Sequence, residues 1–261
     1  MDNSSPDKTD NPPKRALITG GAKRIGAALG KALAKKGYDL AIHFHRSKDA
    51  SQALASQIES DYGVKTCLIE ADLGAPDQWQ TMIDSANKAL GPLSLLVNNA
   101  SLFEPDEPGT ITQESWQDHL VINLQAPVFL AQSFARTAPK GSNIVNIIDQ
   151  RVLALTPKFF SYTIAKSGLF TATQTLAQAL APKGIRVNAI GPGPTLRNAR
   201  QSEADWHRQN AATLLGYGAC PDDICAALVY LIGAKAVTGQ MIAVDGGQHL
   251  TWETPDVLVK E

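Results

Sequence analysis

Cysteine, net charge and long apolar runs are all scarce in this sequence, and each shortage excludes a class of protein. The 261 residues include three cysteines, Cys67, Cys220 and Cys225, an odd number without metal-ligand spacing, which argues against a disulfide framework or a structural zinc site. A formal net charge of -1 gives nucleic-acid binding no electrostatic support. No apolar run approaches the roughly 20 residues of a membrane-spanning helix. We therefore expect idle thiols in a reducing, cytoplasmic compartment, with no metal, nucleic-acid or membrane partner.

The beginning of the chain also lacks an apolar segment. Residues 1–13 are polar and proline-rich, unlike a secretory signal, so we expect a disordered lead-in. The sequence shows no internal repeat, low-complexity tract or linker. With 44% hydrophobic residues in the chain, residues 14–250 are long enough to bury the core of one domain. Residues 251–261 would form a tail after that domain.

Short apolar runs alternate with longer amphipathic segments along the domain. The apolar runs, which predict strands, are residues 15–19, 39–44, 64–70, 94–99, 142–148, 185–190 and 240–245. The segments between them, which predict helices, are residues 24–36, 48–61, 76–90, 112–137, 160–181 and 221–233. Pro127 predicts a kink or a junction of two helices inside the fourth of these. This alternation predicts an α/β fold of the Rossmann type, a doubly wound sheet of about seven parallel strands with helices on both faces.

The turn after the first strand is rich in glycine. Residues 19–26 read TGGAKRIG and lead directly into the first helix. Glycines at such a turn let the backbone approach a pyrophosphate, and the helix N-terminus offers amides and a positive dipole. The spacing is not the usual G-x-G-x-x-G, so a tight turn that binds no ligand stays an alternative.

The second strand is followed by a basic segment, His45-Arg46-Ser47. An NAD site places an acid about 20 residues beyond the glycine turn, against the ribose 2′-hydroxyl. Guanidinium and hydroxyl groups suit a 2′-phosphate instead, and Lys23 and Arg24 can approach from the first turn. The segment favours NADP(H) over NAD(H), with a solvated basic edge as the alternative.

Tyr162 and Lys166 are four residues apart in a predicted helix, so they share one face. A lysine ammonium near a phenol lowers the pKa of the tyrosine, and a tyrosine tuned in this way can exchange a proton near neutral pH. Taken alone the pair is a weak signal, because a tyrosine and a lysine also occur at this spacing by chance on surface helices. Its significance depends on the rest of the chain.

Taken together, residues 14–250 resemble a short-chain dehydrogenase/reductase. The matching pieces are the TGGAKRIG turn, Asp72 after the third strand, NNA at 98–100, Asn123, YTIAK at 162–166, GPG at 191–193 and VDGG at 244–247. The resemblance implies that Tyr162 is the catalytic acid/base and that Lys166 holds the nicotinamide ribose. It implies that Asn123 supports the active-site architecture and its proton relay, and that Asp72 binds the adenine.

The resemblance also implies a set of cofactor-binding positions spread over the strand ends. They are Gly20, Lys23, Arg24, Ile25, Gly26, His45, Arg46, Ser47, Asp72, Leu73, Asn99, Ala100, Ser101, Tyr162, Lys166, Pro192 and Gly193. The usual family threonine four residues after the PG glycine is not clearly present, since Thr195 comes too early. Family resemblance further suggests a homotetramer.

Two departures from the family pattern point to a subgroup. Most members have glycine where Arg24 stands and serine where Asp149 stands. Arg24, HRS at 45–47, NNASLF at 98–103 and the acid at 149 resemble the pteridine reductases and their bacterial dihydromonapterin and dihydrofolate reductase relatives. This likeness implies that Ser101 contacts cofactor and pterin, that Phe103 stacks on the pterin, and that Asp149 joins Tyr162 and Lys166 in catalysis.

The chemistry of Asp149 and Phe103 favours the same substrate class. A serine hydroxyl donates to a ketone oxygen, whereas an ionised aspartate only accepts and would repel an oxyanion. An acid coupled to Tyr162 can relay a proton to a ring nitrogen, and the face of Phe103 can hold a flat heterocycle. Asp149 as a strand-end or capping acid, and Phe103 as a loop packing residue, are the plainer alternatives.

We therefore expect an NADPH-dependent reductase of a pterin or dihydropterin, such as dihydromonapterin, dihydrobiopterin or a dihydrofolate-like compound. A general carbonyl or 3-oxoacyl reductase is the first alternative, and a catalytically idle NADP-binding regulator is the second. Residues 194–218 should form the substrate lid. Trp206 and Arg197 could contact substrate there, although a tryptophan that only covers the core is equally compatible.

Overall fold

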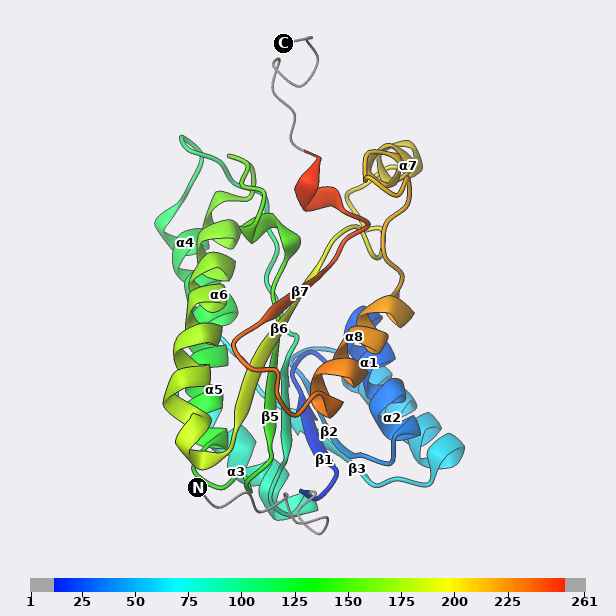
Figure 1. Ribbon diagram of the computed structural model, residues 1–261, viewed down its shortest axis with the longest axis vertical. Coiled ribbons are helices and arrows are strands. Elements are labelled where there is room, and N and C mark those ends of the chain that lie inside the picture. The colour runs from blue at the N-terminus through cyan, green and yellow to red at the C-terminus, as the bar shows by residue number, and fades with distance from the viewer. Residues whose placement is uncertain (1–11, 252–261) are drawn as a thin grey trace, which may run out of the picture.

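The computed structural model describes residues 12–251, which form one parallel sheet between two layers of helices (Figure 1). The strand order is β3-β2-β1-β4-β5-β6-β7, and every neighbouring pair is parallel. The predicted Rossmann-type fold is confirmed. The strands are β1 (Arg15–Ile18), β2 (Asp39–Phe44), β3 (Thr66–Glu70), β4 (Leu95–Asn98), β5 (Asn143–Ile147), β6 (Arg186–Pro192) and β7 (Met241–Val244).

The helices agree with the predicted segments except at two places. They are α1 (Arg24–Lys35), α2 (Lys48–Tyr62), α3 (Gln78–Leu90), α4 (Gln113–Leu120), α5 (Ala126–Phe134), α6 (Phe160–Leu180), α7 (Glu203–Ala211) and α8 (Pro221–Gly233). The long segment around Pro127 is indeed divided, because a π-helical turn, Val121–Gln125, joins α4 to α5. Helix α7 lies inside the predicted lid, where the sequence indicated no helix.

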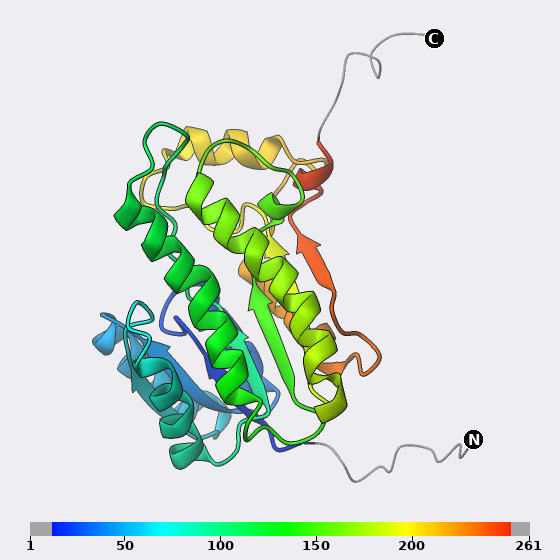
Figure 2. The same ribbon diagram turned by 90° about the vertical axis from the view of Figure 1, so that its left-hand side faces the viewer.

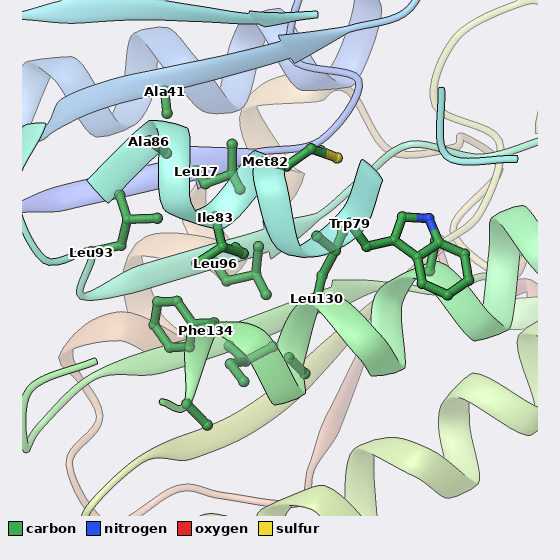
Figure 3. Packing of buried hydrophobic residues seen from close by; sticks show 14 of the residues in the cluster. Leu17, Ala41, Trp79, Met82, Ile83, Ala86, Leu93, Leu96, Leu130 and Phe134 are labelled. Atoms are coloured by element: carbon green, nitrogen blue, oxygen red, sulfur yellow. The ribbon is translucent and has the colours of Figure 1, made fainter. Parts of the chain in front are cut away.

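Alternation along each strand divides the core between the two faces of the sheet. In β1, Leu17 packs under α3 and α5, while Ala16 and Ile18 pack under α1, α2 and α8. Figure 2 shows α4, α5 and α6 laid across one face. Figure 3 shows the cluster on this face, in which Ile83 of α3 and Phe134 of α5 pack with strand residues such as Leu17 and Leu96. Both faces are therefore dry, which is why the strands read as continuous apolar runs.

The order of the strands places a crevice beside β1. From β1, the strands β2 and β3 are added toward one edge of the sheet. Strand β4 then pairs with β1 on its opposite side, so the order of the strands reverses there. In open α/β sheets, ligands bind at such a switch point, outside the carboxyl ends of the strands. Helix α7 lies beyond this end of the sheet (Figure 1). In the described part of the chain, no helix has the length and apolar character needed to cross a membrane.

Candidate active site

A cleft of about 1120 Å³ opens at the carboxyl ends of the strands and collects most of the predicted site residues. The predicted residues in its lining are Gly20, Lys23, Arg24, Ile25, Gly26, His45, Asp72, Leu73, Asn99, Ala100, Ser101, Phe103, Asp149, Tyr162, Lys166, Pro192 and Gly193. Three predicted residues, Arg46, Ser47 and Asn123, lie outside the lining. The described residues contain no cluster of three or more His, Cys, Asp or Glu side chains that could hold a metal ion.

Asp149 and Tyr162 meet at the centre of this cleft. The Tyr162 hydroxyl donates to Asp149 Oδ2 at 3.0 Å, while Asp149 Oδ1 accepts from the backbone N–H of Arg151 at 2.8 Å. Lys166 stands one turn further along α6, and its Nζ donates to the Ile147 carbonyl at 2.8 Å. Asp149 therefore has one oxygen fixed by the backbone and one turned to the phenol.

Burial dominates the acid–base properties of these groups. It raises the pKa of Asp149 and lowers the pKa of Lys166 to about 8, because a buried charge loses its hydration. Burial, reinforced by the nearby carboxylate of Asp149, raises the pKa of Tyr162 well above its ordinary value. The expectation that Lys166 lowers the tyrosine pKa is therefore wrong for this arrangement. In this arrangement Tyr162 carries its proton at neutral pH and can donate it.

Asn123 lies outside the cleft lining but holds residues that line the cleft. It is fully buried in the π-helical turn between α4 and α5, a kind of irregularity that is common at functional sites. Its Oδ1 accepts from Ser101 Oγ at 3.0 Å and from the Leu102 N–H at 2.9 Å, and its Nδ2 donates to the Leu102 carbonyl at 2.9 Å. Asn123 thus holds the loop after β4 in place. Its predicted part in a proton relay stays a prediction.

The glycine turn has the close backbone approach that a dinucleotide needs. A Cβ on Gly26 would lie 2.2 Å from the Gly20 carbonyl oxygen, so no side chain fits there. Asn99 Nδ2 donates to the carbonyls of Thr19 and Gly20 at 2.9 and 3.1 Å. The turn is therefore tied to the end of β4 and leads into the N-terminus of α1, where a pyrophosphate can bind.

His43 is a cleft residue that the sequence reasoning missed. Its ring lies 3.0 Å from the Gly20 N–H through Nδ1 and 3.1 Å from the Ala71 carbonyl through Nε2. Since a carbonyl only accepts, Nε2 carries the hydrogen and Nδ1 accepts from Gly20. Burial lowers the pKa of His43 to about 4, which keeps this arrangement neutral. The available signal was a histidine inside an otherwise apolar strand.

The basic segment after β2 is divided between the cleft and the surface. His45 lines the cleft, and its Nε2 lies 3.8 Å from Asp72 Oδ2. Arg46 is exposed, and the Ser47 carbonyl accepts from the hydroxyl of Ser51 in α2. The role of Arg46 and Ser47 at a 2′-phosphate therefore stays a prediction.

Two arginines hold the lid against the cleft. Arg24 donates to the carbonyls of Leu196 and Arg197 at 2.9 and 3.0 Å. Arg200 forms a 2.8 Å ion pair with Glu104. Of the two candidate lid contacts, Trp206 lines the cleft and Arg197 does not.

An aromatic group lies beside the Asp149–Tyr162 pair. Phe103 meets Tyr162 edge-to-face, with ring centroids 4.7 Å apart. Its face stacks on Phe159 at 4.2 Å with an interplanar angle of 6°. Guanidinium groups lie over these rings, Arg151 at 5.2 Å from Phe159 and Arg200 at 5.8 Å from Phe103. Phe159 and Arg151 are cleft residues that the sequence reasoning did not single out.

Comparison with known proteins defines the class to which this site belongs. A family model described as enoyl-(acyl carrier protein) reductase matches residues 20–249. The chain belongs to the short-chain dehydrogenase/reductase family, as the sequence predicted.

Among solved structures, the chain is similar to the FolM alternative dihydrofolate reductase 1 of Brucella canis, complexed with NADP. The two share 45% identity with a TM-score of 0.88, over 93% of this chain and 96% of that one. It is also similar to a blue fluorescent protein from a metagenomic library, solved with NADPH (31% identity, TM-score 0.85, 90% and 97% coverage). A curated relative is the 3-oxoacyl-[acyl-carrier-protein] reductase FabG of Staphylococcus epidermidis (28% identity, 91% and 99% coverage). The resemblance to the dihydromonapterin reductase-like subgroup is thereby confirmed.

Proposed function

We propose that this protein is an NADPH-dependent reductase of a pterin or dihydropterin, with Tyr162 as the proton donor. The predicted cofactor, NADP(H), is confirmed by the similar structures solved with NADP or NADPH. The glycine turn fits it, because the close Gly20–Gly26 contact excludes a side chain where the backbone leads into the N-terminus of α1. When bound, NADPH supplies the hydride of the reaction.

The observation that carries the substrate assignment is the hydrogen bond from Tyr162 to Asp149. An aspartate at this position offers no donor to a ketone oxygen while it is ionised, and its charge opposes a developing oxyanion. Reduction of a C=N bond instead places hydride on carbon and a proton on nitrogen. Tyr162 can give that proton, and Asp149 can pass a replacement from solvent, since burial raises the pKa of this carboxyl above its ordinary value.

Phe103 supports the same substrate class. Its ring forms part of the cleft wall next to the ring of Tyr162, so a flat heterocycle can lie against it with a ring nitrogen near the proton donor. The dihydrofolate reductase named among the similar structures also acts on a compound of this class. Ser101, held by Asn123, is the nearby hydroxyl that could contact both cofactor and heterocycle.

A carbonyl or 3-oxoacyl reductase is the second candidate function. The likeness to the 3-oxoacyl reductase of S. epidermidis favours it, and Tyr162 with Lys166 would serve both reactions. Asp149 weighs against it for the reason given above.

The deciding experiment measures NADPH oxidation by the purified protein with three panels of substrates. The panels are dihydropterins, simple ketones and 3-oxoacyl thioesters, with NADH as the cofactor control. We expect rapid turnover confined to the pterins. Turnover confined to carbonyl compounds would refute the pterin assignment and leave the family and cofactor standing.

A further inference from the structure

Phe159, the residue immediately before α6, has a backbone conformation that suits its residue type poorly. Its φ and ψ are 56° and 49°, in the left-handed region. Arg24 is the one other non-glycine residue with positive φ in the described part of the chain. Glycine or asparagine is the usual occupant of such a position, and a bulky residue there is strained. Strain of this kind persists only where the surroundings impose it and is concentrated at functional sites.

The side chain of Phe159 does not cap the helix either. It makes no side-chain hydrogen bond to the first turn of α6. The Ser161 N–H instead donates to Asp106 Oδ1 at 3.1 Å, and the Phe160 N–H donates to the Asp106 carbonyl at 3.2 Å. Asp106 thus provides the cap from the loop that follows β4. Neither backbone preference nor capping explains a phenylalanine at position 159. We therefore look for the reason in the contacts of its aromatic ring.

The ring of Phe159 is the backing of Phe103. Their centroids are 4.2 Å apart and their planes nearly parallel, while Arg151 lies over the ring of Phe159 at 5.2 Å. Arg200 also lies over Phe103, but it comes from the lid. A heterocycle can displace a lid side chain, whereas Phe159 is fixed to the helix that carries Tyr162.

We propose that Phe159 is a positioning residue that sets the plane of Phe103 relative to the Tyr162 hydroxyl and thereby favours flat heterocyclic substrates. The left-handed backbone at Phe159 directs its ring toward Phe103, and Asp106 anchors the same loop to α6. Without this backing, Phe103 would have to be ordered by each substrate that binds, which weakens binding. The inference rests on the proposed function, because the substrate that uses Phe103 is taken to be a pterin.

The test compares Phe159→Gly, Phe159→Ala, Phe159→Leu and Phe159→Tyr with the wild-type protein. Tyrosine keeps the stack and should keep the wild-type KM for a dihydropterin. Loss of an aromatic stack should raise KM about three- to tenfold in the other three variants, with kcat changed less than twofold and the NADPH dissociation constant unchanged. Phe129→Ala, which removes a stack on Trp79 away from the cleft, is the matched control and should leave KM unchanged.

Thermal unfolding separates this role from simple packing. Glycine relieves the left-handed strain and alanine does not, so Phe159→Gly should melt about 2–4 °C above Phe159→Ala although both lose the stack. A wild-type KM in Phe159→Gly and Phe159→Leu would overturn the inference alone. An equal rise of KM in Phe159→Tyr would do the same. If the wild-type protein turns over no pterin, the proposed function fails and the inference fails with it.

Discussion

The Tyr162 hydroxyl and Asp149 Oδ2 are 3.0 Å apart, so the proton donor is hydrogen-bonded to an acid. In this pair the phenol keeps its proton, because burial and the carboxylate both raise the pKa of Tyr162. The acid therefore does not activate the tyrosine as a phenolate. It can instead orient the hydroxyl toward a substrate and supply a route for the next proton.

Tyr162→Phe removes the donated proton and leaves the ring in place. We expect kcat with the preferred dihydropterin to fall by roughly 10²- to 10⁴-fold, the usual contribution of a positioned acid. The NADPH dissociation constant, measured by fluorescence titration, should stay within about twofold of wild type. Turnover at the wild-type rate would show that the proton comes from another group.

Asp149 should determine which substrates this site accepts. In Asp149→Ser the hydroxyl can donate to a ketone oxygen and no carboxylate opposes an oxyanion. We expect dihydropterin turnover to fall at least 10²-fold and ketone reduction to rise above the wild-type value. Asp149→Asn, similar in size and uncharged, is the control, and it should lose pterin activity without the same gain on ketones. Unchanged pterin kinetics in both variants would contradict the relay.

Much of this fold could be predicted from the sequence, because strands that are buried on both faces of a parallel sheet are continuous apolar runs. Seven apolar runs became seven strands, and the glycine turn, Asp149, Tyr162 and Lys166 came together at their carboxyl ends. The family resemblance added most of the cofactor positions. The fold prediction was confirmed because it depends on local pattern and on the order of elements along the chain, whereas the roles of the cofactor positions stay predictions.

The predictions that failed or were missing depend on contacts between distant segments. The stack of Phe103 on Phe159 joins the loop after β4 to the start of α6, and no local pattern indicates it. The pKa of Tyr162 is raised by burial, which a spacing of four residues cannot reveal. Helix α7 has no buried residue, so it lacks the apolar stripe by which helices are recognised.

Arg46 should distinguish NADPH from NADH although it lies outside the cleft lining. A guanidinium that pairs with a 2′-phosphate is lost in Arg46→Ala, and NADH has no such phosphate. We expect the NADPH dissociation constant to rise about ten- to 100-fold and that of NADH to change less than threefold. Lys35→Ala, at the far end of α1, is the control for loss of a surface charge. Equal losses for the two cofactors would refute the 2′-phosphate assignment.

Lys166 should make the stability of the protein depend on pH in the alkaline range. Burial lowers the pKa of this lysine from 10.5 to about 8, so between these values the folded protein binds fewer protons than the unfolded chain. The free energy of unfolding therefore increases as the pH rises across this window, and it decreases as the pH falls toward 8. Between pH 8 and 9.5 the Lys166 contribution should increase by about 1.5 kcal/mol.

Lys166→Met isolates this contribution, because the other groups that titrate in the window are present in both proteins. Urea unfolding at pH 8 and 9.5 should therefore show wild type gaining about 1.5 kcal/mol relative to the variant. A constant difference between the two proteins would mean that Lys166 keeps an ordinary pKa when buried. In that case the bond from its ammonium to the Ile147 carbonyl at 2.8 Å would compensate for the lost hydration. A confirmed rise would instead show that burial lowers the pKa of Lys166 in the folded protein.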